Sequence, residues 1–366
     1  MRTRILEKLF PTPNFLKMPS VGLDLSGESV KFAELLLRRG QLRLGRFGGA
    51  VLPRGCIDGG DVKDQDTLIN TLTEVRKKYN LHHIVASLPE EKAYIFNITI
   101  PYVPPKEIRE SIELQLEGNI PVAPDSVLFD YEVTKWNELT DELEVNISAL
   151  PVKVIEDYTH VFRESGLHPL VFETDAQAIL RAILRKNEEG TFMIVDMGRS
   201  RTSFYMYHNG VVLFSSTIDF GGNMITKTIM KEKGLTYNDA EKFKAEKNFL
   251  EGTKNGELFG LVVSTLSVLR DEIQKYLTYW NEHAVKEKAF QKENAKVERI
   301  IFTGGNAALI GITEFFSTYL NVPFELANPW TNIFPPNSDI PPIHHNDSLK
   351  YSVAIGLALF NHLEQR

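Results

Sequence analysis

One short pattern occurs twice in this chain: an apolar strand that ends near an aspartate, a turn of small and hydroxyl residues, and a second strand. The first copy spans residues 22–31 and the second spans 194–203. Each copy is followed by a further apolar stretch, over 42–52 and 211–218, which predicts a third strand. A meander of three strands that is repeated in each half of the chain predicts an internally duplicated α/β fold with two lobes.

The segments between the two copies predict how the rest of the chain is divided. Residues 94–165 combine strand-like and helix-periodic stretches, which indicates a small α+β subdomain inserted into the first lobe. Residues 227–295 are charged and helical in pattern, which indicates a helical subdomain of the second lobe. The remaining segments are expected to form an N-terminal arm (1–19), the core of the first lobe (20–93 and 166–188) and the core of the second lobe (189–226 and 296–366).

The two turns have the chemistry of a phosphate-binding site. Tight turns of glycine and serine expose successive N–H groups, which together bind anions, and hydroxyl groups add further donors. Asp24 and Asp196 repel phosphate, but each can hold, through water, a Mg²⁺ ion that bridges phosphates. We therefore expect a site for a nucleoside triphosphate that is built from Asp24, Ser26, Gly27, Ser29 and Lys31 of the first copy and from Asp196, Gly198, Arg199, Ser200 and Thr202 of the second.

Two glycine-rich turns follow predicted strands in the second half of the chain. Gly221-Gly222-Asn223 comes after the third strand of the second copy, and Gly304-Gly305-Asn306 comes after an apolar strand over 299–303. Glycine has no Cβ, so the backbone at such a turn can approach a flat ring or a ribose closely. Both turns are therefore candidate parts of the same nucleotide site.

Together these segments resemble the actin/Hsp70/hexokinase superfamily of ATPases. Residues 24–31 look like its first phosphate motif, 196–203 like its second and 303–306 like its adenosine motif. A longer set of matches resembles the PilM family of actin-like type IV pilus assembly proteins, and it covers nearly the whole chain from residue 20 onward. The FGGN-x-[IL]-T run of that family is similar to residues 220–226, and further matches lie at 86–89, 98–101, 120–121, 130–133 and 327–329.

The resemblance implies an actin-like fold with ATP and Mg²⁺ as ligands. It also implies a cytoplasmic protein that binds the cytoplasmic N-terminal tail of a PilN-like inner-membrane partner and lies at the membrane through that partner. A homo-oligomer or a ring is a further option for its assembly, and the oligomeric state is left open. The Ala-Glu-x-x-Lys run at 240–244 resembles one that reaches adenine or ribose in related proteins. Glu241 and Lys244 are therefore candidate ligands, and a solvated helix face is the alternative for this charged run.

The first phosphate motif departs from the family pattern, which is usually Asp-Ile-Gly-Ser-Ser-Ser. Here Gly27 stands one place later than the usual glycine, and Glu28 stands where a hydroxyl residue is usual. An acidic side chain beside phosphates is unfavourable unless a metal or a basic group screens it. Arg199 and Arg201 are candidates for that screening or for direct phosphate contact, and the alternative is that both point into solvent.

Hydrolysis requires a residue that orients the attacking water. Glu173 and Asp175 come just before a predicted helix that should start near the cleft, and Gln177 follows them. All three are candidates, and an N-terminal helix cap is an alternative role for Asp175. Whether the chain turns over ATP is left open, with at most slow turnover expected.

Composition and pattern exclude several other classes of function. A net charge of -7 argues against a broad nucleic-acid surface, and the single cysteine excludes an internal disulfide. Two alternatives within the superfamily stay open: a small-molecule kinase, and a filament-forming, membrane-associated protein of the FtsA type. The kinase requires a catalytic aspartate beside a sugar-binding segment, and the FtsA type predicts an amphipathic membrane helix beyond the closing helix expected over 349–363.

Overall fold

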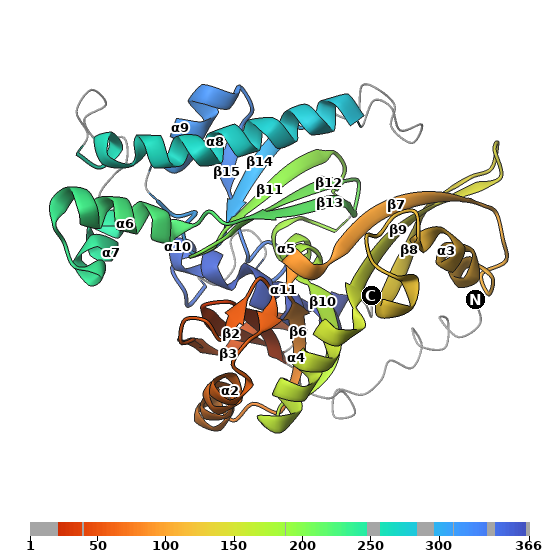
Figure 1. Cartoon of the computed structure of the whole chain (residues 1–366), viewed down its shortest axis with the longest axis horizontal. Coiled ribbons are helices and arrows are strands. Elements are labelled where there is room, and N and C mark those ends of the chain that lie inside the picture. Colours follow the sequence, from red (N-terminus) through yellow and green to blue (C-terminus); the bar gives the residue numbers. More distant parts are fainter. Residues whose placement is uncertain are drawn as a thin grey trace.

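The computed structural model describes residues 21–38, 40–186, 188–246, 257–283, 296–309, 311–334 and 341–363 (Figure 1). The expected N-terminal arm over 1–19 lies outside the described residues. No helix within the described ranges is long and apolar enough to cross a membrane.

Two five-stranded sheets form the centres of the two lobes, and their strands follow the same order. The first sheet has the order β10-β6-β1-β2-β3, and the second has the order β15-β14-β11-β12-β13. In each sheet the strand that carries the repeated aspartate pairs antiparallel with the next strand and parallel with a strand from later in the lobe. The predicted duplication is therefore confirmed. The strands are β1 (Val21–Ser26), β2 (Ser29–Arg38), β3 (Gln41–Val51), β6 (His83–Leu88) and β10 (His168–Thr174), and then β11 (Thr191–Met197), β12 (Thr202–His208), β13 (Val211–Ile218), β14 (Arg299–Thr303) and β15 (Phe324–Leu326).

The two hairpins place their aspartates at similar points. Asp24 lies opposite Lys31 in the register of β1 with β2, and Asp196 lies opposite Ser203 in the register of β11 with β12. Both aspartates are close to the turn of their hairpin, where the strand leaves the buried centre of the sheet. The predicted strands agree with these hairpins to within one or two residues, because apolar β-branched runs bounded by turn residues are a strong local signal.

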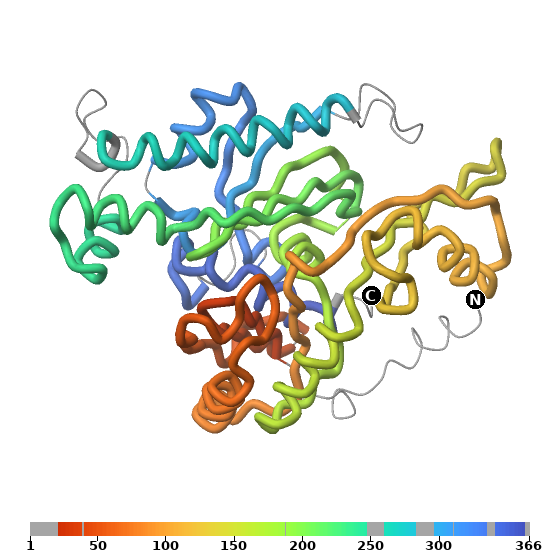
Figure 2. Tube along the Cα trace, in the orientation of Figure 1, coloured from red at the N-terminus to blue at the C-terminus, as the bar shows by residue number. Residues whose placement is uncertain are grey.

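Helices cover both faces of the first sheet. On the outer face, α2 (Gln65–Tyr79) and α4 (Val152–Glu164) bury Leu72, Tyr158 and Phe162 against the sheet. On the inner face lie α5 (Asp175–Ile183) and α11 (Ser352–Leu363). The helix α11 contacts α5, β1, β2 and β6, and Figure 2 shows the blue C-terminal segment beside the red first sheet.

The position of α11 changes the expected division of the chain. The sequence-based assignment gave 296–366 as a whole to the second lobe, but α11 packs on the sheet of the first lobe. The approach is close, since a Cβ at Gly22 would lie 2.0 Å from the carbonyl oxygen of Ala354. The apolar pattern of this helix predicts burial correctly, but it carries no information about which of two apolar sheets covers it.

The inserted subdomain consists of a three-stranded sheet with one helix on it. Its strands β7 (Tyr94–Pro101), β8 (Val127–Asn137) and β9 (Glu142–Pro151) have the order β7-β9-β8, and α3 (Ile108–Leu116) covers one face. Asn146 donates a hydrogen bond to the carbonyl oxygen of Val212 at 2.8 Å, which ties the insert to the edge of the second sheet. The helix α3 begins at Ile108, three residues after Pro104-Pro105, and buries Ile108, Ile112 and Leu116 against the sheet.

The helical subdomain of the second lobe consists of α6 (Gly222–Lys233), α7 (Tyr237–Glu246) and α8 (Glu257–His283), and α9 (Ile312–Leu320) lies beside α8. Aromatic contacts bind this layer to the second sheet, as between Phe204 and Tyr276 and between Phe302 and Phe316. Smaller elements complete the fold. They are β4 (Ile57–Asp58), β5 (Asp61–Val62), α10 (His345–Ser348) and the 3-10 helices η2 (Glu90–Lys92), η3 (Pro124–Ser126) and η4 (Leu349–Tyr351).

Candidate nucleotide-binding site

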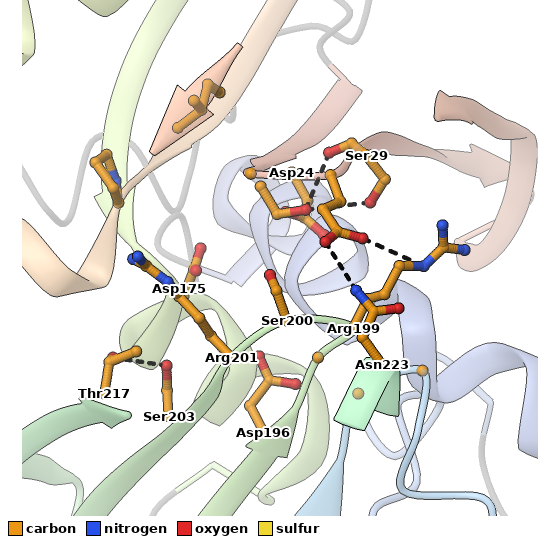
Figure 3. A pocket seen from close by; sticks show the side chains of 18 of the residues that line it. Asp24, Ser29, Asp175, Asp196, Arg199, Ser200, Arg201, Ser203, Thr217 and Asn223 are labelled. Carbon is orange, nitrogen blue, oxygen red and sulfur yellow. Dashed lines mark hydrogen bonds and ion pairs between the residues drawn. The ribbon is translucent and has the colours of Figure 1, made fainter. Parts of the chain in front are cut away.

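A cavity of about 850 Å³ lies between the two aspartate hairpins. Its size is within the range of small-molecule and cofactor sites, which is about 300–1,000 Å³. Figure 3 shows side chains from both lobes pointing into it. The predicted nucleotide ligands that line it are Asp24, Ser26, Gly27, Ser29, Lys31, Asp196, Gly198, Arg199, Ser200, Asn223, Glu241, Gly304, Gly305 and Asn306.

The two aspartates have different surroundings. Lys31 donates a hydrogen bond to Asp24 Oδ2 at 2.9 Å, so the first aspartate is paired within its own hairpin. Burial lowers the pKa of Lys31, but the charge and the hydrogen bond of Asp24 outweigh burial, and the pKa lies above its ordinary value. Burial, followed by the charge of Asp24, raises the pKa of Asp196 to about 6, and Lys31 opposes this rise. A nearby cation would therefore stabilise the ionised form of Asp196.

Because Gly304 has no side chain, the carboxylate of Asp196 can lie directly against it. Its φ of +90° is unusual for other residues, and a Cβ at this position would lie 2.3 Å from Asp196 Oδ1. The Gly304-Gly305-Asn306 turn thus fits against the carboxylate of the second hairpin and lines the cavity beside it. The close approach that the structure shows at this turn is to Asp196, and the expected approach to a flat ring or a ribose stays a prediction.

The turn at Gly221-Gly222-Asn223 has a different role from the one expected. The N–H of Gly222 donates to the carbonyl oxygen of Gly198 at 3.1 Å, and the N–H of Asn223 donates to that of Arg199 at 2.8 Å. A Cβ at Gly221 would lie 2.6 Å from the carbonyl oxygen of Arg199. The two glycines therefore seat the start of α6 on the second phosphate turn and do not line the cavity, whereas Asn223 does.

Lys244 also lies behind the cavity wall. It is buried, and it donates hydrogen bonds to Glu241 Oε1 at 2.6 Å, Thr226 Oγ1 at 2.9 Å and Asn306 Oδ1 at 3.0 Å. Burial lowers the pKa of Lys244 and the carboxylate of Glu241 opposes this. The alternative of a solvated helix face is thus wrong for Lys244, whose hydrogen bonds join α7 to α6 and to the Gly304-Gly305-Asn306 turn. Glu241 lines the cavity.

Thr202 is the fourth predicted ligand that does not line the cavity. Its hydroxyl donates to the carbonyl oxygen of Phe220 at 2.7 Å, so it closes the hairpin from behind. Ser203 and Thr217 line the cavity instead, and their hydroxyl oxygens are 2.8 Å apart. Sequence reasoning assigned the hydroxyl one residue too early, because the alternation of β12 places Ser203 and not Thr202 on the cavity side.

Glu28 bridges the two lobes. Its Oε1 accepts a hydrogen bond from Asn223 Nδ2 at 2.9 Å, and its Oε2 lies 3.7 Å from Arg199 Nε. Figure 3 draws both contacts as dashed lines that reach Arg199 and Asn223. Arg199 therefore screens Glu28, as one of the sequence interpretations proposed.

Arg201 is occupied by carboxylates as well. It forms an ion pair with Glu91 of η2, and its Nε lies 3.2 Å from Asp219 Oδ1. Asp58 of the β4–β5 hairpin lies 3.9 Å from its Nη2. The alternative that both arginines point into solvent is therefore wrong, since each connects the second lobe to an acidic side chain of the first.

The two carboxylates proposed for catalysis have separate environments. Glu173 forms an ion pair with Arg181 and does not line the cavity. Asp175 lines the cavity as the first residue of α5, and Thr174, not Asp175, caps that helix by accepting from the N–H of Gln177. Burial, followed by the charges of Asp24, Glu90 and Asp196, raises the pKa of Asp175 well above its ordinary value.

Sequence reasoning missed Glu90, a buried residue between Pro89 and Glu91, which both line the cavity. Glu90 is only 3% exposed, its Oε2 accepts from the N–H of Ala176 at 3.2 Å, and its Oε1 is buried with no hydrogen-bond partner among the described residues. Burial raises its pKa to about 7. Two adjacent glutamates after a proline are typical of an exposed turn, so the sequence gives no signal that Glu90 is buried.

The donor set of the cavity suits a phosphate–metal group that is held through water. Within the described ranges, no cluster of three or more His, Cys, Asp or Glu side chains is placed to hold a metal ion directly. Acidic side chains do line the cavity, and basic side chains lie among them, including Lys31, Arg54, Lys227 and Lys350. Mixed charge of this kind fits a ligand that carries both anionic phosphates and a hydrated cation.

Comparison with known proteins agrees with this architecture. A protein-family model described as type IV pilus assembly protein PilM matches residues 22–362. A solved PilM-PilN type IV pilus biogenesis complex is similar with a TM-score of 0.74 and 20% identity, over 93% of this chain and 98% of that chain. MreB5 of Spiroplasma citri bound to ADP is similar with a TM-score of 0.55 and 12% identity, over 95% and 98% of the two chains. The ethanolamine utilization protein EutJ from Carboxydothermus hydrogenoformans has a TM-score of 0.52 and 16% identity, over 96% and 91%.

These likenesses to solved structures show the actin-like fold, with two related lobes about a cleft. The family model, which spans nearly the whole chain, adds the identity of the group. This chain belongs to the PilM family of type IV pilus assembly proteins.

Proposed function

We propose that this chain is an ATP-binding scaffold of type IV pilus machinery, which holds the cytoplasmic N-terminal tail of a PilN-like inner-membrane protein. The observation that carries the nucleotide part is that two duplicated hairpins and the Gly304-Gly305-Asn306 turn line one cavity. The similar fold of an MreB5 that is bound to ADP supports it. The partner part is supported by the family and by the similar PilM-PilN complex.

In this proposal the residues of the cavity divide into three groups. Asp24 and Asp196 orient waters of Mg²⁺, which supplies positive charge next to the phosphates when it is bound. Ser26, Ser29 and Ser200 offer hydroxyl donors from the two turns. Glu241 and the Gly304-Gly305-Asn306 turn would lie beside the nucleoside end of the ligand.

The cavity favours holding a nucleotide over turning it over. Burial, followed by the charges of Asp24, Glu90 and Asp196, raises the pKa of Asp175 and so favours its protonated form, which does not withdraw a proton from water. Glu173 is held by Arg181 away from the cavity. We therefore propose slow hydrolysis at most, with the bound nucleotide setting the relative position of the lobes.

The partner tail needs an open surface near the insert. The strand β10 is an edge of the first sheet, and Figure 1 shows it on the side from which the inserted subdomain projects. Leu170 on this strand is 39% exposed. An extended peptide can add a strand to such an edge or lie beside it. We propose that the tail docks there, which would hold this chain at the cytoplasmic face of the inner membrane through its partner.

Two experiments test the proposal separately. Thermal unfolding with and without Mg-ATP tests the nucleotide part, since a ligand at 100 times its Kd stabilises the folded state by about 2.7 kcal/mol. No shift at millimolar Mg-ATP contradicts nucleotide binding. Co-purification with a synthetic peptide of the PilN-like protein's cytoplasmic tail, with and without Mg-ATP, tests the partner part. Absence of binding in both states contradicts the scaffold function.

A further inference from the structure

Glu28 is an acidic group in a place that suits an anionic ligand. It stands at the tip of the first hairpin, and its carboxylate extends to the second lobe. There it accepts from Asn223 Nδ2 at 2.9 Å and lies 3.7 Å from Arg199 Nε. Asn223 is itself fixed, because its Oδ1 accepts from the hydroxyl of Tyr237 at 2.8 Å.

The groups around this carboxylate would otherwise be free for a phosphate. Arg199 belongs to the second phosphate turn, and Asn223 stands in the first turn of α6, where the helix dipole favours negative charge. Lys227, one turn further along α6, also lines the cavity. Glu28 therefore uses donors that a terminal phosphate would use, and it adds a fixed negative charge between the two turns.

A fixed charge of this kind acts unequally on nucleotides. A diphosphate reaches less far between the turns and carries less charge than a triphosphate. The terminal phosphate of a triphosphate must either lie beside the carboxylate or displace it from Arg199 and Asn223. Repulsion between like charges a few ångströms apart, in a partly buried site, shifts an equilibrium by about tenfold or more.

We propose that Glu28 sets the nucleotide preference of this chain, so that the nucleoside diphosphate binds more tightly than the triphosphate. This inference rests on the proposed nucleotide site and specifies its ligand. The contacts of Glu28 with Arg199 and Asn223 already join the two lobes. A diphosphate can therefore occupy the closed cleft without a third phosphate to connect the lobes.

The test compares binding of Mg-ADP and the non-hydrolysable Mg-AMPPNP by isothermal titration calorimetry, for the full chain and for its Glu28→Gln and Glu28→Ala variants. The glutamine variant keeps the size of the side chain and an oxygen that faces Asn223, and it removes the charge. We expect the original chain to prefer ADP. We also expect Glu28→Gln to tighten AMPPNP binding by about tenfold and ADP binding by less than about threefold.

Asp58→Asn is the matched control. Asp58 also lines the cavity, but within the described part of the chain its ion pair is with Arg201, at 3.9 Å, and not with Arg199. Its variant is expected to change both affinities by the same factor. Equal changes for the two nucleotides in Glu28→Gln, or no change, would overturn the role of Glu28 and leave nucleotide binding intact. Absence of any binding in all variants would overturn the nucleotide site itself.

Discussion

The buried carboxyl of Glu90 predicts an unusual dependence of stability on pH. Its surroundings are apolar and acidic: burial raises its pKa to about 7, and the charge of Glu91 adds to the rise. Hydrogen bonds from the N–H of Ala176 and the hydroxyl of Ser215 oppose it. A Glu90→Gln variant keeps the shape and the acceptor for Ala176, and it removes the ionisation.

The size and sign of the effect follow from the two pKa values. The pKa rises from an ordinary 4.5 to about 7 in the folded protein, so the folded state binds more protons than the unfolded state between these values. The free energy of unfolding therefore falls as the pH rises through this window. At about 1.4 kcal/mol per pH unit, the loss reaches about 3 kcal/mol and stays constant above pH 7.

Urea unfolding of both proteins between pH 4.5 and pH 8.5 measures this directly. The unfolding free energy of Glu90→Gln minus that of the original chain should be near zero at pH 4.5, grow up to pH 7 and then level off at about 3 kcal/mol or less. Glu74→Gln, on the exposed side of α2, is the control for loss of a surface carboxylate. Parallel curves for Glu90→Gln and the original chain would refute the burial argument.

Three further predictions concern the site and the docking edge. Asp196→Ala should abolish the thermal stabilisation by Mg-ATP; in the original chain this stabilisation should weaken below about pH 6, where Asp196 is protonated. An unchanged melting shift in Asp196→Ala shows that the metal lies elsewhere. Gly304→Ala should weaken Mg-ATP binding by displacing Asp196, whereas Gly234→Ala, with a φ of +65° but open space around it, should cost about 1 kcal/mol of stability and leave binding unchanged. Leu170→Asp should weaken binding of the partner tail in pull-down assays, and Leu139→Asp, at a 97% exposed position of the insert, should not. Equal losses for the two leucines would argue against the β10 edge.

The sequence predicts the repeated parts of the fold better than the unique ones. The hairpins at Asp24 and Asp196 are local, strongly patterned and present twice, so their strands, turns and common cavity follow from the sequence. The strand β10 was missed, because it is short and contains Pro169. The helix α11 was assigned to the second lobe although it packs on the sheet of the first, because an apolar helix can cover either of two apolar sheets.

The site shows the same limit at the level of single side chains. The predicted glycines of the two phosphate turns and of the Gly304-Gly305-Asn306 turn line the cavity, whereas Gly221 and Gly222 do not. Lys244 and Thr202 do not line it either, because whether a polar side chain points to a ligand or to a buried neighbour depends on contacts that are distant in sequence. The buried position of Glu90 has the same origin, since its contacts lie on α5 and β13.

The place of α11 also affects how the chain reaches its folded state. The inner face of the first sheet stays uncovered by this helix until residues 352–363 have been synthesised, although β1 and β2 are among the first elements made. The second lobe has its strands and most of its helices before that point. The second lobe therefore has the means to fold first during translation, and the first lobe, which carries Glu28 and the proposed docking edge, is completed last. A chain that stalls before α11 would expose the apolar face of the first sheet, which makes this final step the one at which aggregation competes most directly with folding.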